Sequence, residues 1–327
     1  MSDGAVASPP RPLSIGDGEG EDGLSPVASP FSDGEATGVG PRRRRRGIAY
    51  TFLVDEGGPV QAPIITAEVA ERIERSLAVA TQSRIQQVQR LEGNPLGIDV
   101  RRWGQVTGLM VCRGIWYYRF FNQLAGLRVE DEGSLDEALA WYRENRLRCR
   151  IAISPFHANE HLLASLAQRG CRQAEFMSVM FGVPAGDQPA PAAGVTVRVC
   201  QTPALDEFLP LWLASAPAED PTILPAIVRA EFAAWRCYVA TYRGEVAGVA
   251  ALHVADGVGV LAAGATRAEY RDRGCHTALL RRRIADAHAA GCDLVLSQAT
   301  PGTVSQRNME RVGFHTACTQ AIWVDGE

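Results

Sequence analysis

Two arginines and a glycine near residue 270 have the residue types and spacing needed to hold a phosphate group. Arg271 and Arg273 precede Gly274, and a helical pattern over residues 277–290 follows directly. A glycine at a helix start leaves backbone N–H groups free to point at an anion, and nearby arginines add positive charge. This stretch therefore predicts a pyrophosphate site.

The segment before this turn favours the same interpretation. Residues 258–266 are mostly small and apolar, which predicts a strand, and Gly264 lies inside it. A glycine within a strand is typical of a bulge or of a place where a ligand approaches the backbone closely. We therefore expect a strand, a phosphate-binding turn and a helix in that order.

Length and composition allow two domains. The chain has 327 residues, of which 46% are hydrophobic, enough to fill two cores. The net charge of −4 is uneven, because residues 1–41 carry seven acids against Arg11 alone. The remaining chain is nearly neutral, so we do not expect a general nucleic-acid binder. The sequence also lacks an apolar run of the roughly 18–20 residues that a membrane span needs, and a secretory signal.

Cysteine and lysine usage limits the chemistry further. The eight cysteines are scattered without a Cys-x-x-Cys pair, which indicates reduced thiols in a cytoplasmic protein rather than disulfides or a metal site. All 33 basic residues are arginines. A Schiff-base or other catalytic lysine is therefore excluded.

The first 46 residues differ from the rest. They are rich in glycine, proline and acids and end in five consecutive arginines at 42–46. Such a composition predicts a disordered tail. The arginine run favours a solvated linker, and the alternative is a nucleic-acid, targeting or partner-binding role.

Helical and strand patterns alternate along the remaining chain. The expected helices cover residues 64–91, 135–145, 160–169, 205–215, 224–234, 277–290 and 303–312. The expected strands cover residues 106–111, 115–127, 150–154, 174–183, 195–200, 237–242, 246–254, 258–266, 293–298 and 314–324. Ser134 is the expected N-cap of the second helix. This succession predicts an α+β fold.

The chain also repeats itself. An offset of 143 residues aligns its two halves without a gap and places Cys149 on Cys292, Ser154 on Ser297 and Gly170 on Gly313. The same offset places acids 130–132 where the second half has residues 273–275. Carboxylates repel a phosphate. We therefore expect the first half to be structural or to wall one side of a substrate cleft.

Residues 195–325 resemble the GNAT acyltransferases, which move an acyl group from coenzyme A to an amine. Residues 271–276 (Arg-Asp-Arg-Gly-Cys-His) are similar to the family's Arg/Gln-x-x-Gly-x-Gly/Ala loop, and residues 311–314 to its Arg-x-Gly-Phe ending. The resemblance implies two tandem GNAT-like domains of a three-layer type, each a mixed, mostly antiparallel sheet flanked by helices. The expected divisions are 47–187, non-catalytic; 188–194, linker; and 195–327, acetyl-CoA-binding.

The resemblance also implies which residues hold acetyl-CoA. In the family, loop amides cradle the pyrophosphate, and a strand that splays from its neighbour pairs with the pantetheine arm. The implied contacts are Ala265, Thr266, Arg271, Asp272, Arg273, Gly274, Cys275, His276 and Thr277. His276 stands where the family usually has glycine or alanine, and we expect its side chain to point away from the amides.

The proton steps are less defined. Many family members place a tyrosine acid where this chain has Met309. Ser305 and Asn308 are the candidate hydrogen-bond donors in its place, with helix packing as the alternative. His253 is the candidate base, although a lone strand histidine is more often a packed or surface residue. Two further base candidates are Asp220 and Glu231, and covalent transfer through Cys275 is a remote alternative.

The sequence supports three hypotheses of function. The first is an acetyl-CoA-dependent N-acetyltransferase in which an amine, expected to belong to a small molecule, attacks the thioester directly. The second is a non-catalytic acyl-CoA-binding or regulatory protein, which the missing tyrosine favours. A partner-binding module that uses the arginine run is a third hypothesis.

Overall fold

The computed structural model describes residues 64–113, 121–200, 207–208, 210–211 and 224–326, all of which belong to one compact unit. The predicted acidic tail and its arginine run lie outside the described residues.

The first half begins with a long helix, α1 (Ala67–Gln89). Its N-cap is Thr66, whose hydroxyl accepts from the Val69 N–H at 3.2 Å, as this residue type commonly does. The elements that follow are β1 (Ile98–Trp103), β2 (Val106–Val111), β3 (Gln123–Ala125), η1 (Val129–Ser134), α3 (Leu135–Glu144), β4 (Arg150–Ile153), α4 (Glu160–Gln168) and β5 (Cys171–Gly182).

The second half starts at β6 and ends at the last strand of the chain. Its elements are β6 (Val195–Cys200), α6 (Leu224–Glu231), β7 (Arg236–Tyr242), β8 (Glu245–Ala255), β9 (Val258–Thr266), η2 (Ala268–Tyr270), α7 (Cys275–Ala289), β10 (Leu294–Ala299), α8 (Val304–Arg311) and β11 (His315–Asp325). Most of the predicted elements are confirmed to within a few residues.

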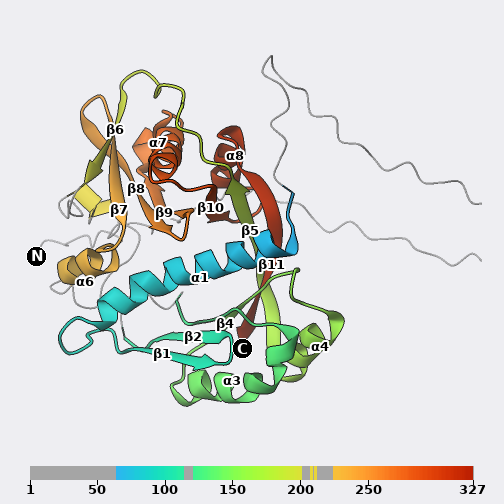
Figure 1. The fold of residues 1–327 in the computed structure, drawn as a ribbon. Coiled ribbons are helices and arrows are strands. Elements are labelled where there is room, and N and C mark those ends of the chain that lie inside the picture. Colours follow the sequence, from blue (N-terminus) through green and yellow to red (C-terminus); the bar gives the residue numbers. More distant parts are fainter. Residues whose placement is uncertain (1–63, 114–120, 201–206, 209, 212–223, 327) are drawn as a thin grey trace, which may run out of the picture. The chain divides into compact units, whose positions relative to one another are not determined.

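The strands form a single mixed sheet in the order β1-β2-β3-β4-β11-β5-β10-β9-β8-β7-β6 (Figure 1). The predicted α+β class is confirmed, but the two halves share this one sheet instead of forming two. They do so because their last strands are exchanged: β5 pairs with β10 of the second half, and β11 pairs with β4 of the first. The predicted domain limits remain a prediction.

Helices cover the second half's part of the sheet on two faces. One cluster of buried side chains joins α1 and α6 to β7, β8 and β9, including Ile73, Val228 and Val249. Another joins α7 and α8 to the opposite side chains of the same strands, including Leu252 and Leu279. Because α1 belongs to the first half, the two halves are packed through a common core.

Some sequence expectations differ from the structure. Strand β1 was not predicted, since Arg101 and Arg102 on it are exposed and break the apolar pattern. Of the expected strand 115–127, residues up to 120 lie outside the described chain and the remainder contains only β3. The described members of 205–215 are helical. Ser134 precedes α3 as expected, but its side chain makes no capping hydrogen bond.

Candidate functional site

The predicted turn adopts the geometry of an anion-binding helix start. Gly274 is the N-cap of α7 with a φ of 82°, a left-handed conformation that glycine adopts without steric cost. The helix is closed by the Ala278 N–H bonding to the Gly274 carbonyl oxygen at 2.9 Å. No side chain caps this end, which leaves the first backbone N–H groups of α7 for an outside acceptor.

Positive charge surrounds this helix start. Arg271, Asp272 and Arg273 are all exposed, and the Arg273 guanidinium lies 5.9 Å from the centre of the Tyr242 ring. Arg243 approaches the same ring at 5.2 Å. These three arginines against one aspartate favour an anionic ligand at the turn.

Strand β9 bulges as it approaches the turn. Val249 of β8 pairs with Ala265, but Ala251 pairs with Ala262, so β9 has one extra residue in this interval. Ala263 takes up the irregularity with a φ of 53°, an uncommon conformation for a residue with a Cβ. The predicted bulge is confirmed, although Ala263 rather than Gly264 carries the left-handed conformation.

Just before the bulge, β9 separates from β10. The two strands are parallel partners only from Leu294↔Val258 to Leu296↔Val260. The next contact is a side-chain bond, in which the Ser297 hydroxyl donates to the Leu261 carbonyl at 2.9 Å. The β10-facing edge of residues 262–266, which includes Ala265 and Thr266, therefore has no strand partner among the described residues.

His276 and Asn308 connect the two helices on this face of the sheet. Asn308 Nδ2 lies 3.2 Å from His276 Nδ1, and the Arg311 guanidinium fixes the amide by donating to Asn308 Oδ1 at 2.7 Å. An amide nitrogen only donates, so the ring accepts at Nδ1 and holds its proton on Nε2. Burial, with the positive Arg283 nearby, lowers the pKa of His276 to about 4, and the ring is neutral at neutral pH.

The His276 side chain is directed toward β9. Its Nε2 is 3.6 Å from the position that a Cβ on Gly264 would occupy, so the imidazole lies under the bulged part of β9. The backbone amides of α7 stay uncapped all the same. The structure thus places His276 inward, between the helix start and the separated strand.

Arg283 is a site residue that the sequence did not single out. It is 2% exposed and its Nη1 donates to the carbonyls of Ala251 and Ala262 at 3.1 Å each. These two residues pair with each other at one end of the bulge in the β8–β9 register. A signal was present, since position 283 falls on the apolar stripe of α7 next to Leu280 and Ile284.

The predicted catalytic residues are only partly brought together. Ser305 and Asn308 lie on α8, one turn apart and half-buried, and only Asn308 reaches α7. His253 lies on β8 against the Trp235 ring, with centroids 5.0 Å apart, among side chains that face α1. Met309 is buried in the apolar core.

The remaining candidates are poorly placed for proton or acyl transfer. Glu231 is fully buried and forms an ion pair with Arg84. Burial raises the pKa of the Cys275 thiol, contrary to the lowering that a helix start alone predicts, and this disfavours covalent transfer. Asp220 lies outside the described residues.

The corresponding turn of the first half has a different character. Residues 129–134 form the 3-10 helix η1 with Glu130, Asp131 and Glu132 in its first turn. Arg128, which aligns with Arg271, forms an ion pair with Glu71 of α1. This turn presents negative side chains where the turn at Gly274 presents uncapped backbone amides, so it is unsuited to a phosphate.

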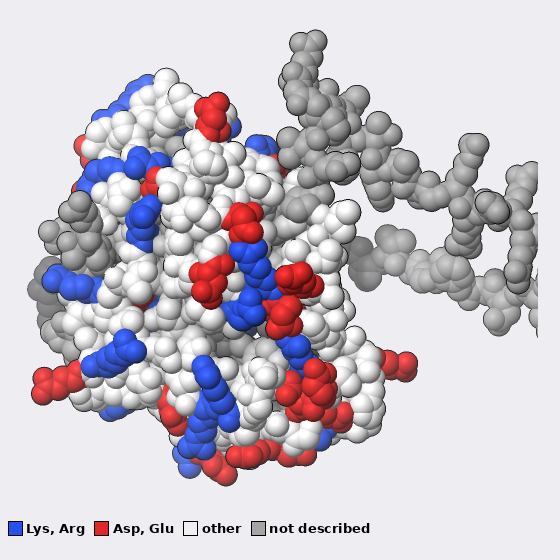
Figure 2. Space-filling model, in the orientation of Figure 1, with Lys and Arg blue, Asp and Glu red and all other residues white. Residues whose placement is uncertain are grey.

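Other classes of site are less evident. Positive and negative side chains are interspersed on the face shown in Figure 2. Among the described residues, no group of three or more His, Cys, Asp or Glu side chains is arranged to hold a metal ion. The helices of the described segments also include none that is long and apolar enough to cross a membrane.

Comparison with known proteins agrees with this geometry. Residues 205–314 match the family described as acetyltransferase (GNAT) family. None of the curated proteins matches the sequence. Residues 205–314 are therefore the part of the chain that is similar in sequence to the GNAT acetyltransferase family.

Solved structures extend the likeness beyond that segment. A GCN5-related N-acetyltransferase from Kribbella flavida is 19% identical, with a TM-score of 0.55 over 76% of this chain and 95% of its own. A tandem GNAT protein from the clavulanic acid biosynthesis pathway is 14% identical, with a TM-score of 0.51 over 80% of this chain and 96% of its own. At these identities the likeness concerns the fold alone.

Proposed function

We propose that this protein transfers the acetyl group of acetyl-CoA to the amine of a small molecule by direct attack. The observation that supports this most is the uncapped start of α7 at Gly274, next to the strand β9 that leaves its partner β10. A pyrophosphate can accept hydrogen bonds from the first amides of a helix, and the unpaired edge of β9 offers main-chain groups to an amide-containing arm.

The residues of this chain have separate roles in the proposal. The amides of residues 274–277, with Arg271 and Arg273, would bind the pyrophosphate, and residues 262–266 would orient the arm. Acetyl-CoA supplies an activated thioester, whose thiolate leaves readily because a thiol has a pKa of about 8.5. A strong acid at the position of Met309 is therefore not essential.

The neutral His276 offers a hydrogen-bond donor, Nε2–H, beside β9. A neutral imidazole can stabilise developing negative charge without giving up its proton. Since Asn308 fixes the tautomer, we assign Asn308 to positioning the ring. Ser305 makes no comparable contact with any described residue and is retained only as a donor on the same helix.

The proposal is tested by calorimetry and by thiol release with the full chain. We expect saturable acetyl-CoA binding and amine-dependent release of free coenzyme A from a panel of small amines. No acetyl-CoA binding at millimolar concentration would refute the proposal. Titration of the unchanged chain with coenzyme A alone is the control for product binding.

A second candidate function is an acyl-CoA-binding regulatory protein without turnover. The buried Met309, at the position where many family members have a tyrosine acid, favours it. This candidate predicts acetyl-CoA binding with no amine-dependent thiol release. Steady release above the rate of hydrolysis would exclude it.

A further inference from the structure

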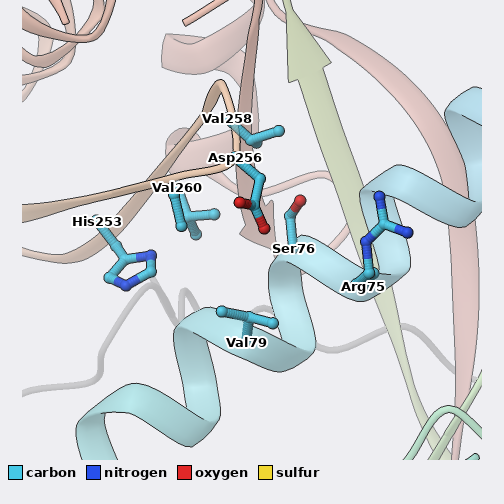
Figure 3. Close-up of a pocket in the computed structure, with 8 residues that line it drawn as sticks. Arg75, Ser76, Val79, His253, Asp256, Val258 and Val260 are labelled. Atoms are coloured by element: carbon cyan, nitrogen blue, oxygen red, sulfur yellow. The ribbon is translucent and has the colours of Figure 1, made fainter.

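A small pocket lies between α1 and the β8–β9 hairpin (Figure 3). The first half of the chain forms one wall and the second half forms the other. The lining residues are Arg75, Ser76 and Val79 from α1, and His253, Ala255, Asp256, Val258 and Val260 from the hairpin. The acetyl-CoA contacts proposed above include none of them.

His253 is the buried polar group of this pocket. It is 7% exposed, and Figure 3 shows its ring at one end of the pocket, beside Val260. Its ring packs against Trp235, but it makes no hydrogen bond within the described part of the chain. Burial lowers the pKa of His253, so the neutral ring can accept a proton at neutral pH. The ring nitrogens are not among the buried side-chain atoms that lack a partner, so they reach solvent and a ligand in the pocket could bond to them.

The pocket ends where the sheet opens. His253 pairs with Val260 across β8 and β9, and Val260 with Leu296 is the last parallel pair before β9 leaves β10. With about 3.3 Å per residue in a strand, Ala262 on the unpaired edge is about 7 Å further along. A ligand at the His253 end would therefore lie next to an acyl group bound along β9.

We propose that this pocket binds the acceptor amine and that His253 accepts its proton. This inference rests on the proposed acetyltransferase function. The apolar lining residues are Val79, Val258 and Val260. Figure 3 shows Asp256 and Ser76 further from His253, with Arg75 beyond them. Because the pocket is small and partly open, this lining fits the amino group and first carbon atoms of a primary amine, whose remaining body would extend into solvent.

The reaction balances with these groups. The free amine nitrogen attacks the thioester carbonyl carbon, a C–N bond forms and the C–S bond breaks. The thiolate leaves with the bonding electron pair. The proton lost by the attacking nitrogen goes to His253, which later releases it to solvent. The products are the acetylated amine and coenzyme A.

The binding site is tested by filling the pocket. Val79 is 38% exposed and lines it, whereas Val254 is 39% exposed and, as the strand neighbour of His253, points to the opposite face. With n-butylamine and benzylamine as probes, we expect Val79→Phe to raise KM for the amine by about tenfold or more. The matched control Val254→Phe should leave KM unchanged, and both variants should bind acetyl-CoA as the unchanged chain does. Equal KM values in the two variants would overturn the pocket assignment.

The base is tested with His253→Gln, which keeps a polar side chain of similar shape. We expect kcat with benzylamine to fall by about 100-fold, within the range for a lost general base, while acetyl-CoA binding persists. We also expect the kcat of the unchanged protein to fall at acidic pH as His253 becomes protonated, and this fall should be absent in His253→Gln. An unaltered kcat and pH profile would overturn the role of His253.

The experiments distinguish a failure of the pocket assignment from a failure of the proposed function. If the unchanged chain and Val79→Phe bind acetyl-CoA and acetylate benzylamine equally well, only the pocket assignment fails. If it acetylates a peptide N-terminus but neither small amine, the acceptor class assigned to the pocket is wrong. If it does not bind acetyl-CoA, the proposed function fails first.

Discussion

His276 on α7 and Asn308 on α8 are joined by a hydrogen bond of 3.2 Å between Nδ1 and Nδ2. This contact links the helix that begins at the anion-binding turn to the helix that follows the separated strand β10. It also holds a neutral imidazole beneath the bulge of β9, where the family usually has only a small residue. The side chain that departs from the family pattern is thus built into the site.

The His276 ring predicts a specific pH dependence of stability. Its pKa is lowered to about 4 in the fold, against about 6.5 in an unfolded chain. Below pH 6.5 the unfolded chain takes up a proton that the folded chain refuses, so stability is lost as pH falls from 6.5 to 4. At about 1.4 kcal/mol per pKa unit, the ring accounts for roughly 3 kcal/mol.

The measurement is urea unfolding at pH 7.5 and pH 4.5. His276→Gln keeps a hydrogen-bonding side chain but cannot titrate, so it should lose less stability than the unchanged chain on acidification. The other histidines contribute equally to both proteins. Parallel losses would show that His276 is protonated freely in the fold.

The buried Arg283 is expected to support both the stability of the fold and the binding of acetyl-CoA. It donates to three backbone carbonyls, those of Leu279, Ala251 and Ala262. Ala251 and Ala262 are the strand pair at one end of the bulge. Arg283→Met leaves these oxygens with fewer donors, so we expect a loss of about 2–4 kcal/mol in the free energy of unfolding. Acetyl-CoA binding should weaken too, because the bulge is no longer held.

Arg282→Met is the matched control for this prediction. Arg282 is the exposed neighbour and forms a surface ion pair with Asp286 at 3.0 Å, which is worth at most about 1 kcal/mol. Denaturant unfolding and calorimetry on both variants give the comparison. Similar effects from the two substitutions would contradict a special role for Arg283.

The Arg84–Glu231 ion pair predicts a structural rather than a catalytic role for Glu231. The pair joins α1 to α6, and the Arg84 guanidinium also lies about 5 Å from the Phe232 ring centre. Glu231→Gln leaves a buried cation without its carboxylate, which costs about 3–5 kcal/mol. Activity per folded molecule should be retained.

Replacing both partners separates these roles further. Arg84→Met with Glu231→Leu should recover much of the stability, since apolar replacement of a buried pair is often neutral. Chemical unfolding measures the recovery. If every Glu231 variant is folded but inactive, Glu231 takes part in catalysis after all.

Replacing the glycine at each end of α7, Gly274 or Gly291, should affect acetyl-CoA binding differently. Gly274 and Gly291 have φ values of +82° and +78°, and a Cβ would lie 3.0 Å from Ala192 at the first but meet nothing within 4 Å at the second. Either substitution to alanine costs about 1 kcal/mol for the left-handed backbone. Only Gly274→Ala should weaken acetyl-CoA binding, as calorimetry can determine. Equal weakening by Gly291→Ala would mean that general loosening of α7 is responsible.

Local patterns predicted much of this fold. The α7 stripe, the strand before it and Gly274 each follow from side-chain periodicity or backbone freedom, and the structure has them where expected. The exchange of β5 and β11 could not be predicted in this way. Strand partners far apart in sequence depend on the whole sheet, and the local pattern of a strand does not specify which strand it pairs with.

The site was predictable in its anion-binding part and less so elsewhere. A helix start with a glycine needs only local sequence, but Arg283 and the inward His276 depend on how α7 packs against β8, β9 and α8. His253 was singled out by residue type alone. Its burial against Trp235 and its position across from α1 come from contacts between the two halves.

The central claim is that acetyl-CoA binds at residues 271–277 and not at the acidic copy in the first half. Calorimetric titration of the full chain with acetyl-CoA tests it most directly. The account predicts one molecule bound per chain, and no binding to the folded double variant Arg271→Glu, Gly274→Pro. Two molecules bound per chain, or unchanged affinity in the double variant, would contradict it.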